Sequence, residues 1–403
     1  MPASEEQKES FIQNRESTSY WKDAWRRLRQ NKVSMVALGV IILLILFAFI
    51  GPMVVPYGYD QFNSGAENLY PWHYSLKDQR LIDSVSGNAQ ERLEAALADA
   101  EAEKGEALNS REIAKIRAVV NSTTVDLEDF IKENNIKHKA FGYSVSELKR
   151  IEAGEKVFPH VFGTDRYGRD NMVRLMIGTR VSMLIGVCAA LLVLLIGATY
   201  GSISGFFGGK VDAVMMRIVE LIYSIPEVLV VLLLSTALKP ALTTFQNSGN
   251  GFFQKLIGLL GPNLISLFFA FGLLYWVTMA RIIRGQILQL KEQEFITAVR
   301  ALGAGSGRII KKHLLPNCIG QIVVTTCLQI PSAIFLESFL SFLGVGVSSP
   351  MTSLGSMASE ALSGIQTYGY RLVIPAIVLS IMILAFNLFG DGLRDALDPR
   401  LKK

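Results

Sequence analysis

Charged side chains are scarce in this sequence. Asp, Glu, Lys and Arg together make up 19% of its 403 residues, whereas apolar residues make up 50%. Because the apolar residues are gathered into long stretches, this balance argues against a soluble globular protein and favours one that lies in lipid. Cysteine is scarce as well. Cys188, Cys318 and Cys327 all lie in or beside apolar stretches, so we expect buried free thiols rather than a disulfide framework or a metal site.

We also expect no cleavable leader. Residues 1–32 are largely polar, and no small-residue cleavage site follows the first apolar stretch, so we expect that stretch to remain as an anchor. Within the polar segment, Trp21, Trp25 and Leu28 recur at helical spacing among arginines. This pattern fits either an amphipathic helix in the membrane interface or an ordinary basic flank.

No nucleotide-binding loop is recognisable. Residues 204–210 end in Gly-Lys, but Val211 stands where a P-loop needs Ser or Thr. The glycines of 303–307 suggest a dinucleotide turn, yet they lie in a basic loop between apolar stretches. Both segments are interpreted as turns, and the sequence has neither an HExxH motif nor a Ser-His-Asp arrangement. We therefore expect no enzyme activity, no cofactor and no metal in this chain.

Six apolar stretches are long enough to cross a bilayer core, which takes about 20 helical residues. They lie at 33–55, 181–207, 214–238, 256–280, 319–347 and 372–390. Such stretches must be helices, because lipid offers no hydrogen-bond partner to open backbone groups. The sequence therefore predicts an all-α polytopic membrane protein with about six transmembrane helices.

Lysine and arginine are concentrated in alternate short loops. They crowd the segment before the first stretch, the loop after the second, the loop 281–320 and the end of the chain, whereas the opposite short loops hold little more than Lys239, Lys255 and Arg371. Basic loops stay in the cytoplasm. We therefore expect both termini to be cytoplasmic.

Four segments follow from this topology. They are a cytoplasmic amphipathic segment (1–32), a first transmembrane helix (33–55), an extracytoplasmic segment with a helical insert (56–178) and a five-helix core (179–403) that includes the cytoplasmic loop 281–320. Helices are predicted in the insert at 90–104, 127–136 and 144–153. Its histidines His73 and His138 are isolated, so a helical cap without a catalytic or metal cluster is expected.

The loop 281–320 has the most specific pattern. Residues 294–302 predict a short helix with Glu294, Ala298 and Ala301 on one face, ended by Gly303. A second basic helix, 308–315, runs into Pro316. Small residues on the first helix would let it seat closely in a groove of a partner, whereas the alternative is a solvated basic loop.

The residues of this loop resemble a known family. Ala298-Val299-Arg300-Ala301-Leu302-Gly303, followed after nine residues by His313-Leu314-Leu315-Pro316-Asn317, is similar to the EAA loop of binding-protein-dependent ABC importer permeases. Thr297 and Val299 depart from the general pattern, which is compatible with the peptide-transporter branch. The resemblance implies a coupling helix that docks on an ATPase, carried here by Glu294, Ala298, Ala301, Leu302, Gly303 and Pro316.

A second motif is similar to the GTD-x-x-GRD signature of C-type dipeptide and oligopeptide permeases. It lies at 162–170 and contains Gly163, Thr164, Asp165, Gly168, Arg169 and Asp170. Further stretches resemble the same branch: 205–209 with Asp212 and Arg217, 280–286, 340–344 and Asp398-Pro399-Arg400. The resemblance covers 25–60 and 158–403 but not the insert at 70–157, which is longer than this branch usually carries.

The resemblance implies a permease subunit, with a type I ABC importer core, in a bacterial plasma membrane. Its expected partners are a second homologous permease, two cytoplasmic ATP-binding subunits, an extracytoplasmic peptide-binding protein and lipid, but no nucleic acid. The cargo would be dipeptides or oligopeptides; nickel chelates or glutathione remain alternatives. A secondary transporter is disfavoured because no matched repeats with interrupted helices are visible, and a membrane-embedded hydrolase because no nucleophile and base converge.

Three acidic residues lie inside the apolar stretches. An ionised carboxylate that faces lipid costs about 2.5 kcal/mol or more. Glu337, with Ser341 one turn later, could line the translocation path or contact a partner, or it could act structurally within the bundle. Glu227 follows Pro226, where we expect the third helix to be broken. Glu220 is expected to pair locally with Arg217.

Overall fold

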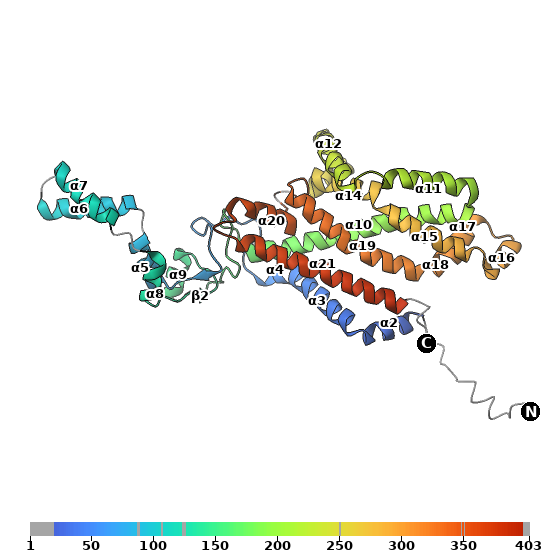
Figure 1. The fold of residues 1–403 in the computed structure, drawn as a ribbon, viewed down its shortest axis with the longest axis horizontal. Helices are drawn as coiled ribbons and strands as arrows, with labels where there is room; N and C mark the ends of the chain where they lie inside the picture. The colour runs from blue at the N-terminus through green and yellow to red at the C-terminus, as the bar shows by residue number, and fades with distance from the viewer. Residues whose placement is uncertain are drawn as a thin grey trace, which may run out of the picture. The chain divides into compact units, whose positions relative to one another are not determined.

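A computed structural model describes residues 20–86, 89–105, 108–122, 126–249, 251–347, 349 and 351–397. These residues are mostly helical (Figure 1). Contacts divide the chain into two compact units. The membrane unit comprises the residues up to Val54 and those from Leu175 onward, and the insert unit comprises Val55–Arg174. The motif Asp398-Pro399-Arg400 lies outside the described residues.

Among the described residues, six helical segments are long and apolar enough to cross a membrane. They are Lys32–Val54 (α3, Lys32–Phe49, with α4, Gly51–Val54), Asn171–Phe207 (α10), Glu227–Asn247 (α12), Pro262–Leu290 (α14, Pro262–Leu274, with α15, Trp276–Leu290), Ile319–Phe342 (α19) and Tyr370–Leu397 (α21). The prediction of an all-α polytopic protein with about six spans is therefore confirmed.

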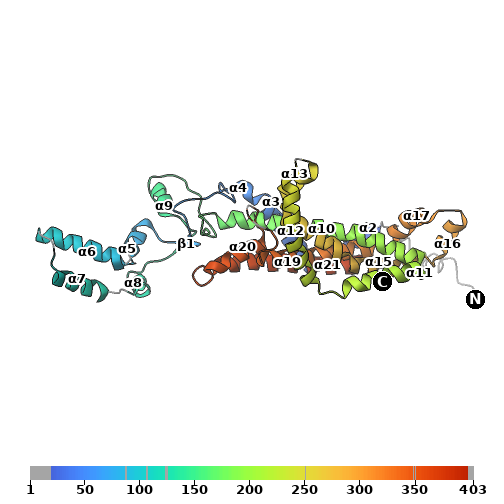
Figure 2. The ribbon, with the colours of Figure 1, turned by 90° about the horizontal axis from the view of Figure 1, so that it is seen from above.

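Two predicted span boundaries were wrong. The third span does not run over 214–238, because α11 (Gly209–Tyr223) ends before Pro226 and α12 begins at Glu227. Proline has no amide hydrogen to donate and disfavours helical backbone in the residue before it. The fourth span begins at Pro262, because Gly261 with φ of 83° separates it from α13 (Phe252–Leu260). In Figure 2, α12 and α13 stand across the direction of α10 and α21.

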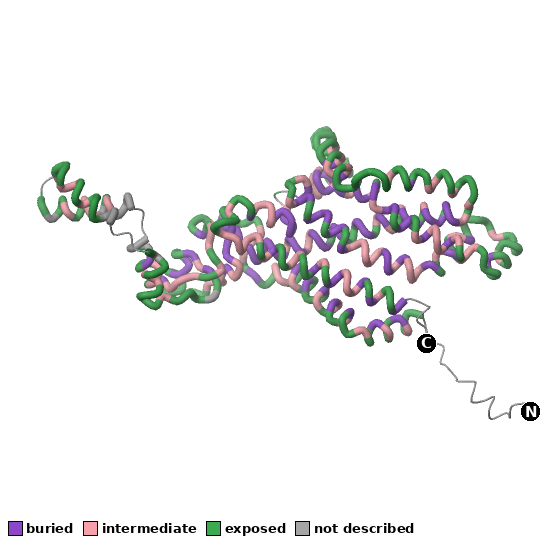
Figure 3. Tube along the Cα trace, viewed as in Figure 1, coloured by how far each residue is buried: buried purple, intermediate pink, exposed green. Residues whose placement is uncertain are grey.

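Close packing of α10 against α15 forms the centre of the membrane unit. A Cβ atom on Gly201 would lie 2.4 Å from the backbone oxygen of Ala280, and one on Gly205 would lie 2.9 Å from that of Arg284. Glycines one turn apart thus let the two backbones approach closely, as is common between helices in lipid. The buried core around them includes Met279, and Figure 3 shows buried positions along the helices in the middle of the membrane unit.

The segment before the first span is an α-helix, α2 (Tyr20–Gln30). Its buried residues are Ala24 and Leu28, and Ala24 packs in one cluster with Val324 of α19 and Leu397 of α21. Trp21 and Trp25 are 52% and 47% exposed. Leu28 therefore does not share an outer face with the two tryptophans, which leaves the indole rings on the surface of the helix.

The described residues of the insert unit form five helices and a two-stranded sheet, followed by the start of α10 (Asn171–Phe207). The helices are α5 (Leu76–Ser86), α6 (Ala89–Lys104), α7 (Ser110–Ser122), α8 (Leu127–Glu133) and α9 (Val145–Glu152). Strands β1 (Trp72–His73) and β2 (Lys139–Ala140) are antiparallel, with Trp72 opposite Ala140. The predicted helices at 90–104, 127–136 and 144–153 correspond to α6, α8 and α9; α5 and α7 were not predicted.

A buried histidine holds part of the insert unit together. His160 Nδ1 lies 2.7 Å from Asp170 Oδ2, and its Nε2 lies 3.2 Å from Glu147 Oε1. Burial alone would lower the pKa of His160, but the two carboxylates outweigh it and raise the pKa from 6.5 to about 9. The imidazolium then donates to both carboxylates at neutral pH. Its neighbour Tyr57 stacks on the ring.

Candidate coupling surface and translocation path

A short helix, α16 (Glu294–Ala301), projects from the membrane unit and ends in a glycine-dependent cap. Gly303 has φ of 81°, its amide donates to the carbonyl of Arg300 at 3.0 Å, and the amide of Ala304 donates to Val299 at 3.3 Å. These two bonds form a Schellman motif, which needs a left-handed residue at the position of Gly303. The cap therefore fixes where α16 stops.

One face of α16 is anchored and the other is open. Ile296 is fully buried in the same core cluster as Ile309 and Leu314. The outward residues are Glu294, Phe295, Ala298, Ala301 and Leu302, all exposed, with Leu302 at 87%. This exposed surface, called here the α16 face, combines small and apolar side chains. Figures 1 and 2 show α16 at one end of the membrane unit.

The second basic helix of the loop was predicted as one element over 308–315. The structure instead has α17 (Ser306–Ile309), a π-helical turn (Ile310–Leu314) and α18 (Leu315–Asn317). Pro316 lies in the first turn of α18 and supplies no amide hydrogen to the helical ladder. The wider turn just before it is consistent with that missing donor.

An ion pair joins α11 to α15. Its two residues lie in two separate stretches that each resemble the same permease branch. The Arg284 guanidinium donates from Nε and Nη2 to the two carboxylate oxygens of Asp212, both at 2.5 Å. Ser204 of α10 also donates to Asp212. The Arg284 hydrogen bonds, the largest effect, hold the pKa of Asp212 below its usual range. The pair therefore stays charged at neutral pH and ties three helices together.

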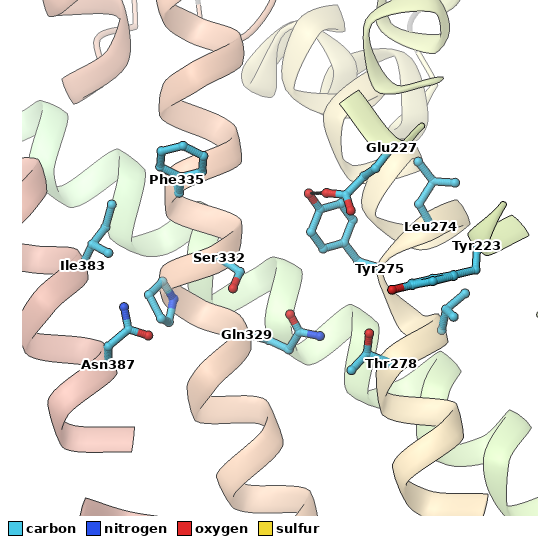
Figure 4. Close-up of a pocket in the computed structure, with 12 residues that line it drawn as sticks. Tyr223, Glu227, Leu274, Tyr275, Thr278, Gln329, Ser332, Phe335, Ile383 and Asn387 are labelled. Carbon is cyan, nitrogen blue, oxygen red and sulfur yellow. Dashed lines mark hydrogen bonds between the residues drawn. The ribbon is translucent and has the colours of Figure 1, made fainter. Parts of the chain in front are cut away.

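The membrane unit also contains a polar cavity of about 440 Å³ (Figure 4). Its walls come from the break before α12 and from α15, α19 and α21. The lining residues with polar side chains are Tyr223, Glu227, Tyr275, Thr278, Gln329, Ser332 and Asn387. The Tyr275 hydroxyl donates to the Glu227 carboxylate. Polar groups in a membrane segment are costly against lipid, so this wall faces water, cargo or another protein chain.

A second cavity of about 510 Å³ continues the polar wall. It shares Thr278, Gln329 and Ser332 with the first. Its further polar residues are Gln321, Thr325 and Arg394. The two cavities together, called here the polar lane, run from Glu227 to Arg394. Each amide side chain of this lane is an isolated polar residue in an apolar helix, which is a signal in the sequence. The sequence alone could not show that these side chains converge.

Glu337 and Ser341 lie inside the helix packing of this chain. Glu337 has no exposed surface, and Ser341 is 1% exposed. Ser182 of α10 donates to the carboxylate at 2.7 Å, Ser341 donates at 2.7 Å and Ser338 at 3.2 Å. Ser341 in turn accepts from the amide of Val347. The carboxylate is therefore a junction between α10, α19 and the loop after α19.

The six signature residues of 162–170 form the turn that leads into α10. Asp165 accepts from the amides of Tyr167 and Arg169 and from the side chains of Arg169 and Arg174. Asp170 accepts from the amide of Val173, which caps the first turn of α10. All of these contacts are internal to the insert unit.

The remaining signature residues support the same turn through the backbone. Thr164 donates to the carbonyl of Ala66 and accepts from the amide of Leu69. Gly163 and Gly168 have φ of 65° and 72°, and a Cβ atom on Gly168 would lie 2.1 Å from the Asn63 oxygen. The motif thus builds a rigid turn, and its residues are positioned by one another.

A six-span helical bundle with an anchored projecting helix and a polar lane defines a membrane transport subunit. The chain belongs to the family described as binding-protein-dependent transport system inner membrane component, whose model matches residues 197–403. A second model, described as the N-terminal TM domain of oligopeptide transport permease C, matches residues 19–71. The family confirms the expected type I ABC importer permease core. The chain is therefore one membrane subunit of a transporter complex.

Relatives support the same assignment. The oligopeptide transport system permease protein OppC of Bacillus subtilis (strain 168) is 35% identical over 390 residues, which is 97% of this chain and 93% of the relative. The dipeptide transport system permease protein DppC of the same organism is 34% identical over 400 residues, which is 99% and 92%. OppC of Escherichia coli (strain K12) is 40% identical over 241 residues, which is 60% and 72%.

These matches correct one expectation about the insert. The resemblance was expected to stop at the insert of 70–157. The alignments with the two Bacillus proteins cover 97% and 99% of this chain, so they include the insert. The insert is therefore a feature shared with those relatives and not an addition peculiar to this chain.

Proposed function

We propose that this chain is a permease subunit of an ATP-driven importer of peptides. It forms half of the path together with a second homologous permease, two cytoplasmic ATPases power it, and an extracytoplasmic binding protein delivers the peptide. The names of the relatives support peptides over nickel chelates and glutathione as cargo. The chain itself hydrolyses no ATP.

The observation that carries this proposal is that α16 has one exposed face and one buried residue, Ile296, that anchors the helix to the core. Ile296 lies in one core cluster with Met279 and Ile283 of α15. A push on the exposed side of α16 is therefore transmitted to helices that wall the polar lane. Closure of the ATPases would move α16 and switch the lane from outward-facing to inward-facing, which is the role proposed for Glu294, Ala298, Ala301, Leu302, Gly303 and Pro316.

Affinity purification of the tagged chain from membranes tests this function. We expect a second six-helix permease and one or two ATPases to come with it, and the reconstituted complex to take up peptide only when ATP and the binding protein are present. Recovery of the chain alone, with uptake driven by an ion gradient, would overturn the proposal and favour a secondary transporter.

The orientation is proposed from the placement of basic residues. α2, α16, α17 and the start of α11 lie toward one end of the membrane unit (Figures 1 and 2). Lysines and arginines are frequent in these segments and directly beside them: Lys22, Arg26, Arg27, Arg29, Lys32, Lys210, Lys291, Arg300, Arg308, Lys311 and Lys312. The positive-inside rule makes that end cytoplasmic. Since α3 leads away from it, residues 55–174 are extracytoplasmic and both termini cytoplasmic, in a bacterial plasma membrane.

A cysteine placed at Ser110 should react with a membrane-impermeant thiol reagent in intact cells. Ser110 is exposed at the start of α7. The background is a variant in which the three natural cysteines are replaced, and Ser306→Cys in the loop beside α16 is the matched control, expected to react only after lysis. Labelling of Ser110→Cys only after lysis contradicts the orientation.

A further inference from the structure

Glu227 is a carboxylate at the edge of the polar lane without a basic partner. It is exposed at the first position of α12, directly after the break at Pro226. Its hydrogen-bond partner is the neutral hydroxyl of Tyr275. Among the described residues, no lysine, arginine or histidine pairs with it. An unpaired carboxylate in a membrane segment is expensive, so it marks a place where a cation is received.

The acid of α19, Glu337, differs from Glu227 in its burial and in how fully its carboxylate is hydrogen-bonded. Glu337 is fully enclosed and accepts from three serine hydroxyls. A carboxylate that binds a moving cargo must instead be accessible from a cavity and must have hydrogen-bonding capacity left for the cargo. Only Glu227, of these two, lines a cavity that the structure describes.

The rest of the lane limits what kind of cation fits. In Figure 4, Ser332 and Gln329 lie across the cavity from Glu227, Thr278 lies below Tyr275, and Asn387 lies farther to the left. These side chains are neutral hydrogen-bond donors and acceptors that suit peptide amides. The basic residue of the lane, Arg394, is at its far end. The carboxylate suits an ammonium group, the amide side chains suit a peptide backbone, and the guanidinium suits a carboxylate. Together they match a zwitterionic peptide.

We propose that Glu227, positioned by the Tyr275 hydroxyl, receives the α-ammonium group of the peptide in the translocation path. This inference rests on the proposed function and adds the residue and the chemical group that meet there. A weak, solvent-accessible ion pair suits a transport site, because the cargo must leave as readily as it arrives.

The test uses the complete reconstituted transporter with its binding protein. Uptake of a lysine-free tripeptide is compared with uptake of the same peptide N-acetylated, and the ratio of the two rates is measured for the natural chain and for Glu227→Gln. The same binding protein delivers peptide to the natural transporter and to the Glu227→Gln transporter. Any preference of the binding protein for one of the two peptides therefore cancels when the two ratios are compared. We expect the ratio to fall at least about tenfold in Glu227→Gln.

Glu220→Gln is the matched control. It also removes one exposed carboxylate from the neighbouring helix α11, but Glu220 pairs with Arg217 and does not line the lane. Its ratio should equal that of the natural chain. An unchanged ratio in Glu227→Gln overturns the inference while peptide uptake itself stands. Absence of peptide uptake by the natural complex would instead overturn the proposed function.

A second measurement needs no variant of the site. A carbodiimide that joins carboxylates to amines is added to the natural transporter during turnover with a labelled tripeptide, and the modified residue is mapped. We expect the label at Glu227 with the free-amine peptide and none there with the acetylated one. Label confined to other carboxylates, or equal with both peptides, overturns the inference even if Glu227→Gln fails to assemble.

Discussion

Replacing Gly303 by proline should abolish peptide uptake, by about 100-fold or more, while the chain still inserts in the membrane. The native φ of 81° is inaccessible to proline, whose ring holds φ near −65°. Proline also removes the amide that donates to Arg300 in the cap of α16. The end of α16 and the exposed Leu302 would then be displaced from the surface that meets the ATPase. Uptake and peptide-stimulated ATP hydrolysis of the reconstituted complex measure the effect.

Two alanine variants distinguish the effect of the helix cap from the effect of any substitution in this loop. A Cβ atom would meet nothing within 4 Å at either Gly303 or Gly305, but only Gly303 has positive φ. Gly303→Ala should therefore cost about 1–2 kcal/mol of left-handed strain and reduce uptake partially. Gly305→Ala, at φ of −69°, should leave uptake unchanged. Full uptake by Gly303→Pro would remove Gly303 from the coupling role.

How far the sequence predicted the fold depends on whether a local pattern carried the information. Hydropathy alone identified six spans, since each is a long apolar stretch. It misplaced the bounds of the third and fourth because a window average registers composition and not backbone angles. The break expected at Pro226 is confirmed, because proline has a local effect on the helix. Gly303 likewise predicted the end of a helix correctly, because a helix cap has a local residue preference.

Contacts between distant segments could not be predicted in the same way. Asp212 and Arg284 form a bidentate pair across 72 positions of sequence. Neither local sequence indicates which distant residue is the partner. The contacts of His160 could not be predicted either, because its carboxylate partners Glu147 and Asp170 come from different turns of the chain. His138, one of the two histidines expected to be isolated, lies 2.9 Å from the Tyr74 hydroxyl.

The two membrane carboxylates show the same limit most clearly. In the sequence, Glu227 and Glu337 are both single acids in apolar stretches, and either one fits a path or a structural role. Burial separates them, because Glu227 is exposed to a cavity and Glu337 is enclosed. Burial depends on how five or six helices pack, which no single span determines. We therefore propose the structural role for Glu337 and Ser341.

Glu337→Ala should destabilise the membrane unit by about 3 kcal/mol or more. The hydroxyls of Ser182 and Ser341 are almost completely buried and donate to this carboxylate. Each would lose its acceptor, and a buried polar group left without a partner costs about 1–3 kcal/mol. Removal of the side chain from a packed site adds the cost of a cavity. Thermal unfolding of the purified complex measures the loss.

Glu337→Gln distinguishes a structural carboxylate from one that meets cargo. The amide keeps one acceptor oxygen and the volume of the side chain, so we expect most of the stability to be retained and peptide uptake to persist. If Glu337 instead lined the path, Glu337→Gln would reduce uptake without any change in thermal unfolding. Glu220→Ala, which removes an exposed carboxylate of an ion pair, should cost under about 1 kcal/mol. The contrast between the two alanine variants reflects burial, because both remove the same chemical group.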